Sequence, residues 1–102
     1  MFGDIKNKLN QGKEDLAKRM ADTYVRSLSP SKQIEIIANG NRQIMDIKIH
    51  EEIYEDKEQF EDELIICLNN ALEKADIMHQ EELKTVMKSN MPNIPGLDGL
   101  LD

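Results

Sequence analysis

The chain has 102 residues, the size of one small domain, because domains ordinarily take about 100 to 200 residues. Thirteen Lys and Arg stand against twenty Asp and Glu, which gives a formal net charge of -7, and only 4% of the residues are aromatic. The single cysteine, Cys67, excludes an intrachain disulfide. This composition predicts one helix-rich soluble domain over residues 1–102 and excludes a second domain.

No segment of the sequence resembles a membrane span or a signal peptide. The longest apolar runs, such as residues 64–68, are far shorter than the roughly 20 apolar residues that cross a bilayer. The first residues lack a basic head followed by an apolar stretch. We therefore expect a cytoplasmic protein with no membrane partner.

An amphipathic helix is predicted over residues 4–24, because apolar side chains recur there at helical spacing. These are Ile5, Leu9, Leu16 and Met20. Residues 23–27 then read as a short strand that overlaps the end of the helix. Residues 29–32, which include Pro30, predict the loop that closes this strand.

A β-hairpin is predicted in the middle of the chain. The segments 33–38 and 42–49 alternate apolar and polar residues and flank Asn39-Gly40-Asn41, and Asn-Gly favours a type I′ turn between antiparallel strands. Alternation places the apolar side chains of each strand on one face: Ile34 and Ile36 on the first, Met45, Ile47 and Ile49 on the second. This apolar face needs a helix to cover it.

A long helix is predicted over residues 57–89, with Asp56 and Gln59 spaced like a capping box. Its apolar stripe is formed by Phe60, Leu64, Cys67, Leu68, Ala71, Ala75 and Met78. Such a helix is about 50 Å long, whereas a compact chain of this size has a radius of gyration of about 13 Å. We therefore expect its far end to be covered by another chain in a two-fold homodimer, and residues 91–102, rich in Pro and Gly, to form a flexible tail.

The sequence carries no pattern typical of catalysis or of metal binding. There is no glycine-rich phosphate loop, no His-Glu-x-x-His and no pair of cysteines. His50, His79 and Cys67 are interpreted as ordinary surface, capping or core residues. The carboxylates of residues 61–63 fall in the first turns of a helix, where negative charge offsets the helix dipole. We expect no enzyme activity, no cofactor, no metal and no small-molecule substrate.

The charge is unevenly distributed along the chain. Residues 1–50 carry a net charge of +3 and residues 51–102 a net charge of -10. The acidic total argues against a purely electrostatic nucleic-acid binder, because Lys and Arg supply most of the affinity for DNA. Basic side chains nevertheless recur on the first helix and in the last turns of the long one. They are either solvated faces and helix-dipole partners, or patches that a dimer doubles and that straddle a duplex.

Several short motifs occur in a distinctive order: Met-Phe-Gly at residues 1–3, Asn39-Gly40-Asn41-Arg42, Ile47-Lys48-Ile49, and the runs at residues 56–64, 69–75 and 92–97. In this order and spacing they resemble the YbaB/EbfC family of small nucleoid-associated proteins over nearly the whole chain. The resemblance implies an α+β, helix-strand-strand-strand-helix protomer with a small antiparallel sheet and a long C-terminal helix. It also implies a tweezer-like homodimer that binds double-stranded DNA in the nucleoid with low sequence specificity and acts in nucleoid organisation and gene regulation.

Two sets of residues are expected to carry this function. Backbone phosphates of DNA are expected to contact Lys6, Lys8, Lys13, Lys18, Arg19, Lys84 and Lys88. The dimer interface is expected on the long helix, at Leu64, Cys67, Leu68, Ala71 and Ala75.

A second hypothesis remains open, in which the chain is an acidic dimeric adaptor or chaperone that binds a protein partner. The partner would contact the apolar long helix or residues 94–101. The two hypotheses differ in whether the basic side chains gather on one surface or are cancelled by nearby acids, namely Glu14, Asp15, Glu81 and Glu82.

Overall fold

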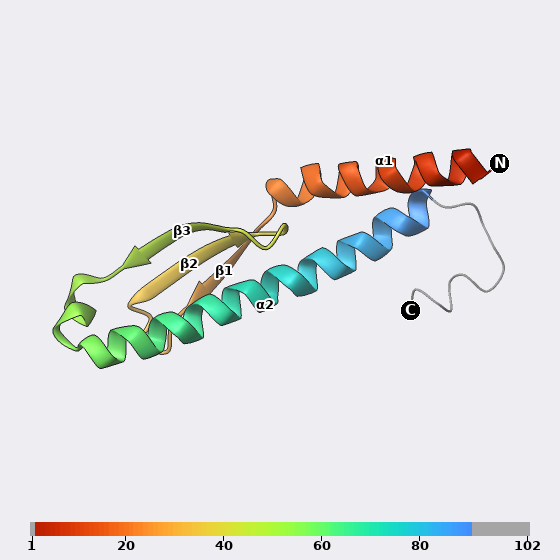
Figure 1. The fold of residues 1–102 in the computed structure, drawn as a ribbon. Helices are drawn as coiled ribbons and strands as arrows, with labels where there is room; N and C mark the ends of the chain where they lie inside the picture. Colours follow the sequence, from red (N-terminus) through yellow and green to blue (C-terminus); the bar gives the residue numbers. More distant parts are fainter. Residues whose placement is uncertain (1, 91–102) are drawn as a thin grey trace.

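The computed structural model describes the backbone of residues 2–90 and the side chains of residues 10–12 and 14–88. Its elements follow in the order α1 (Phe2–Ala21), β1 (Tyr24–Leu28), β2 (Ile34–Asn39), β3 (Ile44–Ile49), the short 3-10 helix η1 (Glu51–Glu55) and α2 (Lys57–Asn90) (Figure 1). The predicted α+β class and the predicted order of elements are confirmed. The tail predicted at residues 91–102 lies outside the described residues.

The three strands form one antiparallel sheet in the order β1-β2-β3, and α2 runs across one face of it (Figure 1). The core lies between the central strand and the helix: Ile34, Ile36, Ala38, Cys67, Ala71 and Ala75, all without exposed surface. Alanine and cysteine at these helical positions let α2 approach the sheet closely. Each buried isoleucine contributes about 1.5 to 3 kcal/mol through the hydrophobic effect.

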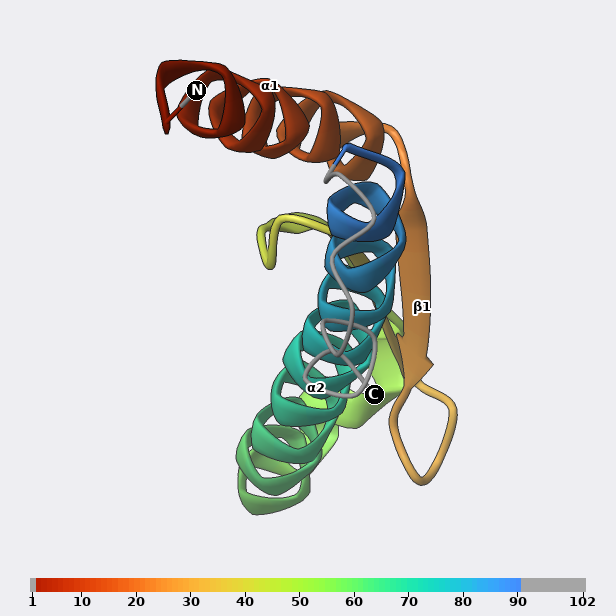
Figure 2. The same ribbon diagram turned by 90° about the vertical axis from the view of Figure 1, so that its right-hand side faces the viewer.

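The long helix extends beyond the sheet, and α1 covers its far half. Leu16 and Met20 of α1 pack on Val86 of α2, and all three are buried, with Met78 and Leu83 beside them. Figures 1 and 2 both show α1 alongside the C-terminal half of α2. The molecule is consequently a rod 63 Å long, with a radius of gyration of 18.5 Å.

This packing corrects one expectation. The helix does overshoot its sheet, but the apolar far end is covered by α1 of the same chain, so it does not require a second copy. The amphipathic pattern of residues 4–24 predicts an apolar face on this helix, but it does not predict that this face packs on α2.

The turn between β2 and β3 differs from the predicted type I′ turn, which needs positive φ at both of its central residues. Among the non-glycine residues of this turn only Arg42 has a positive φ, of 63°. The side chain of Asn39 organises the turn instead, because its Oδ1 accepts hydrogen bonds from the backbone N–H of Asn41 at 2.9 Å and of Gln43 at 3.2 Å.

The prediction of which β3 side chains lie on the helix side of the sheet is also partly wrong. A bulge beside Ala38 pairs that residue with Ile44 and leaves Met45 as the extra residue, so Ile44 replaces Met45 on the helix side of the sheet. Ile47 and Ile49 are on that face as predicted, opposite the buried isoleucines of β2. Because α2 packs on β1 and β2, the helix-side face of β3 is left largely bare.

Gly40 joins the two halves of the rod. Its backbone N–H donates to the carbonyls of Met20 at 3.0 Å and Thr23 at 2.9 Å, and its carbonyl lies 2.7 Å from Nδ1 of His79. The turn between β2 and β3 is therefore held against the end of α1 and against α2. A Cβ atom at this position would lie 2.4 Å from Sδ and 2.9 Å from Cβ of Met20.

We expect the substitution Gly40→Ala to lower the free energy of unfolding by about 1 to 3 kcal/mol, because the added methyl overpacks this junction. Urea denaturation followed by circular dichroism measures the change. In a double-mutant cycle, Met20→Ala removes Sδ and Cγ of Met20, which relieves most of the clash and leaves Cβ, so the double variant should lose less stability than the sum of the single changes. Additive losses would contradict a steric origin.

Candidate nucleic-acid interface

The described basic residues of the predicted DNA-binding set lie on the half of the rod where α1 packs beside the C-terminal half of α2 (Figure 1). The last turn of α1 lies near the middle of the rod, beside the turn between β2 and β3. Lys18 and Arg19 are exposed in the last turn of α1, and Lys84 and Lys88 are exposed near the C-terminus of α2. Because α1 and α2 pack side by side, residues far apart in the sequence share this half of the rod (Figure 2). Lys6, Lys8 and Lys13 belong to α1 as well, but their side chains lie outside the described part of the structure.

One of these cations is already paired within the protomer. The guanidinium of Arg19 lies 2.9 Å from a carboxylate oxygen of Glu82, which ties α1 to α2. Both side chains are partly exposed, and such a pair ordinarily contributes less than about 1 kcal/mol. Within the described residues Lys18 and Lys84 form no ion pair. The exposed carboxylates of Glu14, Asp15 and Glu81 lie on the same two helices as the basic residues. They offset part of the positive charge, which is therefore moderate.

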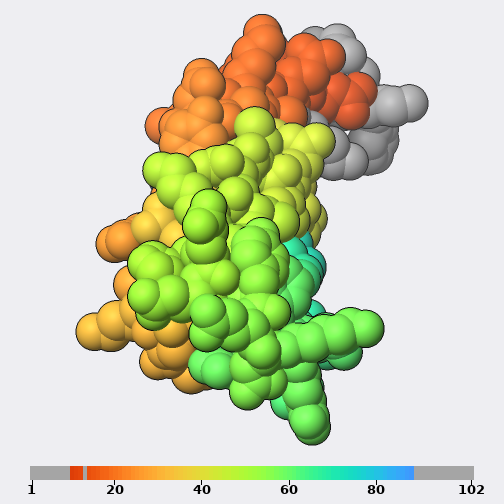
Figure 3. Space-filling model, turned by 90° about the vertical axis from the view of Figure 1, so that its left-hand side faces the viewer, coloured from red at the N-terminus to blue at the C-terminus, as the bar shows by residue number. Residues whose placement is uncertain are grey.

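The opposite end of the rod is strongly acidic. Residues 51–63 contain eight acidic residues and one basic residue, Lys57. Figure 3 looks onto this end, where the green atoms of η1 and of the start of α2 form much of the surface. The carboxylates of η1 and of the first turns of α2 disfavour the approach of a polyanion to that part of the surface, because like charges at an exposed surface raise the energy of approach. The fold therefore separates an acidic end from the half that carries the paired basic helices.

Glu63 has a structural role that its position in the sequence did not reveal. Its carboxylate accepts hydrogen bonds from the hydroxyl of Ser31 at 2.7 Å, the backbone N–H of Ser31 at 2.9 Å and the side-chain amide of Gln59 at 2.6 Å. These bonds, led by the Ser31 hydroxyl, lower the pKa of Glu63 from its ordinary 4.5 to about 2. The sequence predicts that Glu63 offsets the dipole of α2. In the structure its carboxylate instead binds Ser31 and thereby holds the turn between β1 and β2 against α2.

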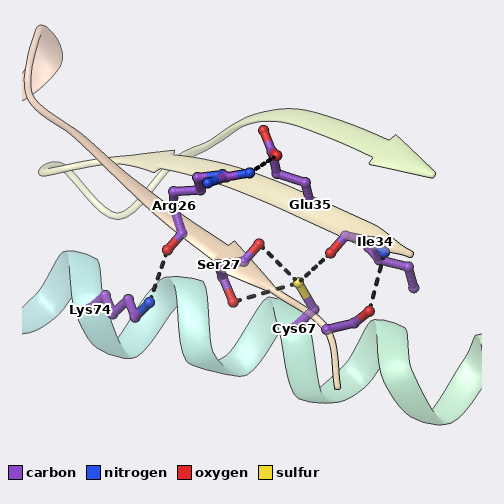
Figure 4. A network of polar contacts seen from close by, with 7 residues as sticks. Arg26, Ser27, Ile34, Glu35, Cys67 and Lys74 are labelled. Atoms are coloured by element: carbon purple, nitrogen blue, oxygen red, sulfur yellow. Dashed lines mark hydrogen bonds and ion pairs between the residues drawn. The ribbon is translucent and has the colours of Figure 1, made fainter. Parts of the chain in front are cut away.

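Three residues of the predicted dimer interface are core residues of the protomer. Cys67, Ala71 and Ala75 have no exposed surface, and Sγ of Cys67 lies 3.4 Å from the Ser27 carbonyl and 3.7 Å from the Ile34 carbonyl (Figure 4). These three side chains are covered by the sheet of their own chain, which corrects their assignment to an interface. The other two, Leu64 and Leu68, are half-buried on the same helix.

An apolar surface remains next to Leu68, and we call it the β3–α2 strip. It consists of Ile44, Ile47 and Ile49 of β3 with Ile65, Leu68 and Leu72 of α2. Four of them expose between 36% and 59% of their surface: Ile44, Ile47, Ile65 and Leu72. Residues 65, 72 and 79 follow each other at two-turn spacing, and His79 contacts Gly40 of the turn between β2 and β3. This flank of α2 therefore faces the bare side of β3.

Comparisons with known proteins are consistent with this architecture. A model of the YbaB/EbfC DNA-binding family matches residues 1–91. The chain belongs to the YbaB/EbfC DNA-binding family. A relative from Flavobacterium johnsoniae named nucleoid-associated protein is 37% identical over 100 residues, which cover 98% of this chain and 93% of that protein. A nucleoid-associated protein of Geobacillus is 36% identical over 81 residues, covering 78% of this chain and 73% of the relative.

A solved structure shows the same fold. The crystal structure of an uncharacterized Helicobacter pylori protein, HP0035, superimposes with a TM-score of 0.77, over 85% of this chain and 92% of that one, at 22% sequence identity. The family model confirms the family resemblance seen in the sequence, and this structure confirms the fold. Among the described residues of this YbaB/EbfC chain, no helix is long and apolar enough to cross a membrane.

We expect Glu63→Gln to lower the thermal unfolding midpoint at neutral pH, because the ionised carboxylate holds the turn between β1 and β2. A lowered folded-state pKa stabilises the fold above the ordinary pKa of 4.5, and this contribution is lost as the pH falls towards about 2. The difference between variant and wild type should therefore shrink over that interval. Differential scanning calorimetry across this pH range tests it, with the exposed Glu58→Gln as the control. A difference that is constant with pH would contradict the assignment.

Proposed function

We propose that this protein binds double-stranded DNA as a nucleoid-associated homodimer, through phosphate contacts and with low sequence specificity. The observation that carries the proposal is the presence of exposed basic residues from α1 and from the C-terminal part of α2 on one half of the rod, away from the acidic start of α2. Family membership supports the same conclusion. Nucleoid organisation and gene regulation in a bacterial cytoplasm are the proposed roles, without enzymatic chemistry.

The proposed contacts favour phosphates over base edges. Lysine carries a point charge on a flexible stem, which suits a phosphate and gives no fixed pattern of donors for reading bases. We assign these contacts to Lys18, Lys84 and Lys88, together with Lys6, Lys8 and Lys13 on the same helix as Lys18. Arg19 contributes less, because Glu82 already neutralises part of its charge.

The proposed homodimer is formed through the β3–α2 strip. Four of its six apolar side chains are solvent-exposed in the protomer, and burying them provides the driving force for association. β3 is also an edge strand. The His50 N–H donates to the Gln33 carbonyl, so the pair of His50 and Gln33 is hydrogen-bonded, and hydrogen-bonded pairs alternate along an antiparallel ladder. The backbone N–H and C=O groups of Ile47 therefore point away from β2, to the open edge of the sheet. A two-fold axis there buries the same strip on both copies and doubles the basic helices.

We expect Ile47→Asp to convert the dimer into a monomer, because a charge in the buried seam is costly. Sedimentation velocity measures the change. Ile66→Asp is the matched control: Ile66 is 44% exposed and Ile47 is 42% exposed. Ile66 lies on the other flank of α2, the one that carries Lys74 beside β1. Dissociation by the Ile66 variant alone would place the seam on that flank.

We expect duplex DNA to bind with strong salt dependence, with a log–log slope of about -5 if roughly six phosphates are neutralised. Lys18→Glu should weaken binding and reduce the steepness by about 0.9, the value for one phosphate contact. Lys57→Glu reverses one charge at the acidic end and should leave affinity unchanged. Fluorescence anisotropy at several salt concentrations measures these effects.

A slope near zero, or equal effects of the two substitutions, would contradict the phosphate-contact mechanism. A dimer that binds no DNA even at low salt would favour the second hypothesis, in which the chain binds a protein partner. The pairing of Arg19 with Glu82 is the observation that favours this alternative.

A further inference from the structure

A second positively charged surface lies on the face of the sheet that α2 does not cover. It is an open depression of about 420 Å³ that we call the sheet-face pocket, lined by Arg26 of β1, Lys32 of the turn between β1 and β2, Glu35 of β2, Lys48 of β3, and His50 just after it. Three cations and one carboxylate meet there, in a protein whose net charge is -7. None of these residues belongs to the proposed DNA-binding set.

The strand register explains why these side chains converge. Glu35 is paired with Leu28 on one side and with Lys48 on the other, so all three project from the same face of the sheet. Arg26 lies two residues before Leu28 and projects from that face as well. Figure 4 shows Arg26 and Glu35 on the side of the sheet away from α2.

The pocket already stabilises one anion. The guanidinium of Arg26 donates to the Glu35 carboxylate at 2.7 Å. This bond first, and the charges of Arg26 and Lys48 in addition, lower the pKa of Glu35. The pair neutralises Glu35 and one cation, which leaves Lys32 and Lys48 without an ion-pair partner among the described residues.

The backbone of Lys32 gives a second, independent observation. Its φ is 65°, a conformation in which glycine is favoured and a lysine costs about 1 kcal/mol. The turn is held rigidly in this shape, because the Lys32 N–H donates to the Ser29 carbonyl at 2.8 Å and Glu63 binds the neighbouring Ser31. The chain thus keeps a cation at the rim of the pocket in a strained conformation, and such strain is concentrated at functional positions.

Two further polar groups line the same depression. Nδ1 of His50 accepts a hydrogen bond from the Glu52 backbone N–H at 3.3 Å, which places the ring proton of the neutral tautomer on Nε2 and leaves that atom as a donor. Gln33 also lines the pocket, and its buried Oε1 has no hydrogen-bond partner among the described residues. His50 therefore adds a donor to the two free lysines, whereas the Gln33 oxygen is an acceptor and does not attract an anion.

We propose that the sheet-face pocket binds a phosphate group. A phosphate presents several acceptor oxygens and up to two negative charges, which match two ammonium groups, the remaining guanidinium N–H donors of Arg26 and the imidazole of His50. A single carboxylate would use only part of this set. The phosphate comes either from the DNA backbone or from a small free phosphate compound, and both sources have the same recognition chemistry.

The test is a titration of the full chain with inorganic phosphate, followed by 1H–15N NMR in a phosphate-free buffer. We expect saturable shifts confined to the amides of residues 26, 32–35 and 48–50. A parallel titration with potassium chloride at equal ionic strength should not reproduce them, because it changes only the screening.

Two substitutions make the test specific. Lys32→Gly removes the cation and places at φ 65° the residue that tolerates it best, so the thermal midpoint should be unchanged or higher while phosphate binding weakens at least about tenfold. Lys48→Gln should weaken binding similarly, and Lys57→Gln, which removes an exposed charge at the acidic end, should have no effect. Shifts that do not saturate, that appear equally with chloride, or that persist in both pocket variants would overturn the proposal.

A short duplex DNA then distinguishes the two sources. Displacement of bound phosphate from the pocket amides by the duplex identifies the DNA backbone as the ligand and adds a contact surface to the proposed function. Retention of phosphate in the pocket while the duplex binds elsewhere, or while it fails to bind, identifies a free phosphate compound. The two proposals are therefore tested by separate measurements: the pocket by the shifts of its amides with phosphate, and the DNA interface by the binding of the duplex.

Discussion

The architecture depends on one mismatch of length between the sheet and the helix that covers it. A six-residue strand extends about 20 Å, whereas the 34 residues of α2 extend about 51 Å. Cys67, Ala71 and Ala75 cover the central strand in the first half of the helix, and Leu16 and Met20 of α1 cover the second half. One helix thus supports two small cores, and the molecule becomes a rod.

This rod places opposite charges and an apolar surface at separate positions. The acidic residues lie where α2 begins, and the basic helices lie where it ends. Because a single helix cannot cover all three strands, the inner face of β3 remains bare beside Ile65 and Leu72. A chain with a modest core can gain stability by burying that strip against a second copy, and the proposed dimer then presents two sets of basic helices at a fixed separation.

The hydrogen bonds of Gly40 hold the sheet, α1 and α2 in fixed positions relative to one another. Its N–H bonds to α1 and its carbonyl bonds to α2, so the orientation of the basic helices is set by the turn between β2 and β3. Arg42 adds an ion pair with Asp76 at 2.7 Å from the same turn. The turn between β1 and β2 is fixed in a comparable way by Glu63, and this rigidity extends to the cations of the sheet-face pocket. Both turns therefore connect the sheet to surfaces with proposed binding roles.

The sequence by itself determined the α+β class, the element order and the core positions Ile34 and Ile36, because hydrophobic periodicity is a local property of the chain. It also indicated the family, through short motifs in a particular order. Only the tertiary structure decided that α1 covers the end of α2, that Cys67 is core, and that Arg26, Lys32 and Lys48 share one pocket. Those facts depend on strand register, on a bulge at Ala38 and on which flank of a helix meets a partner, and no local pattern in the chain encodes contacts between residues so far apart.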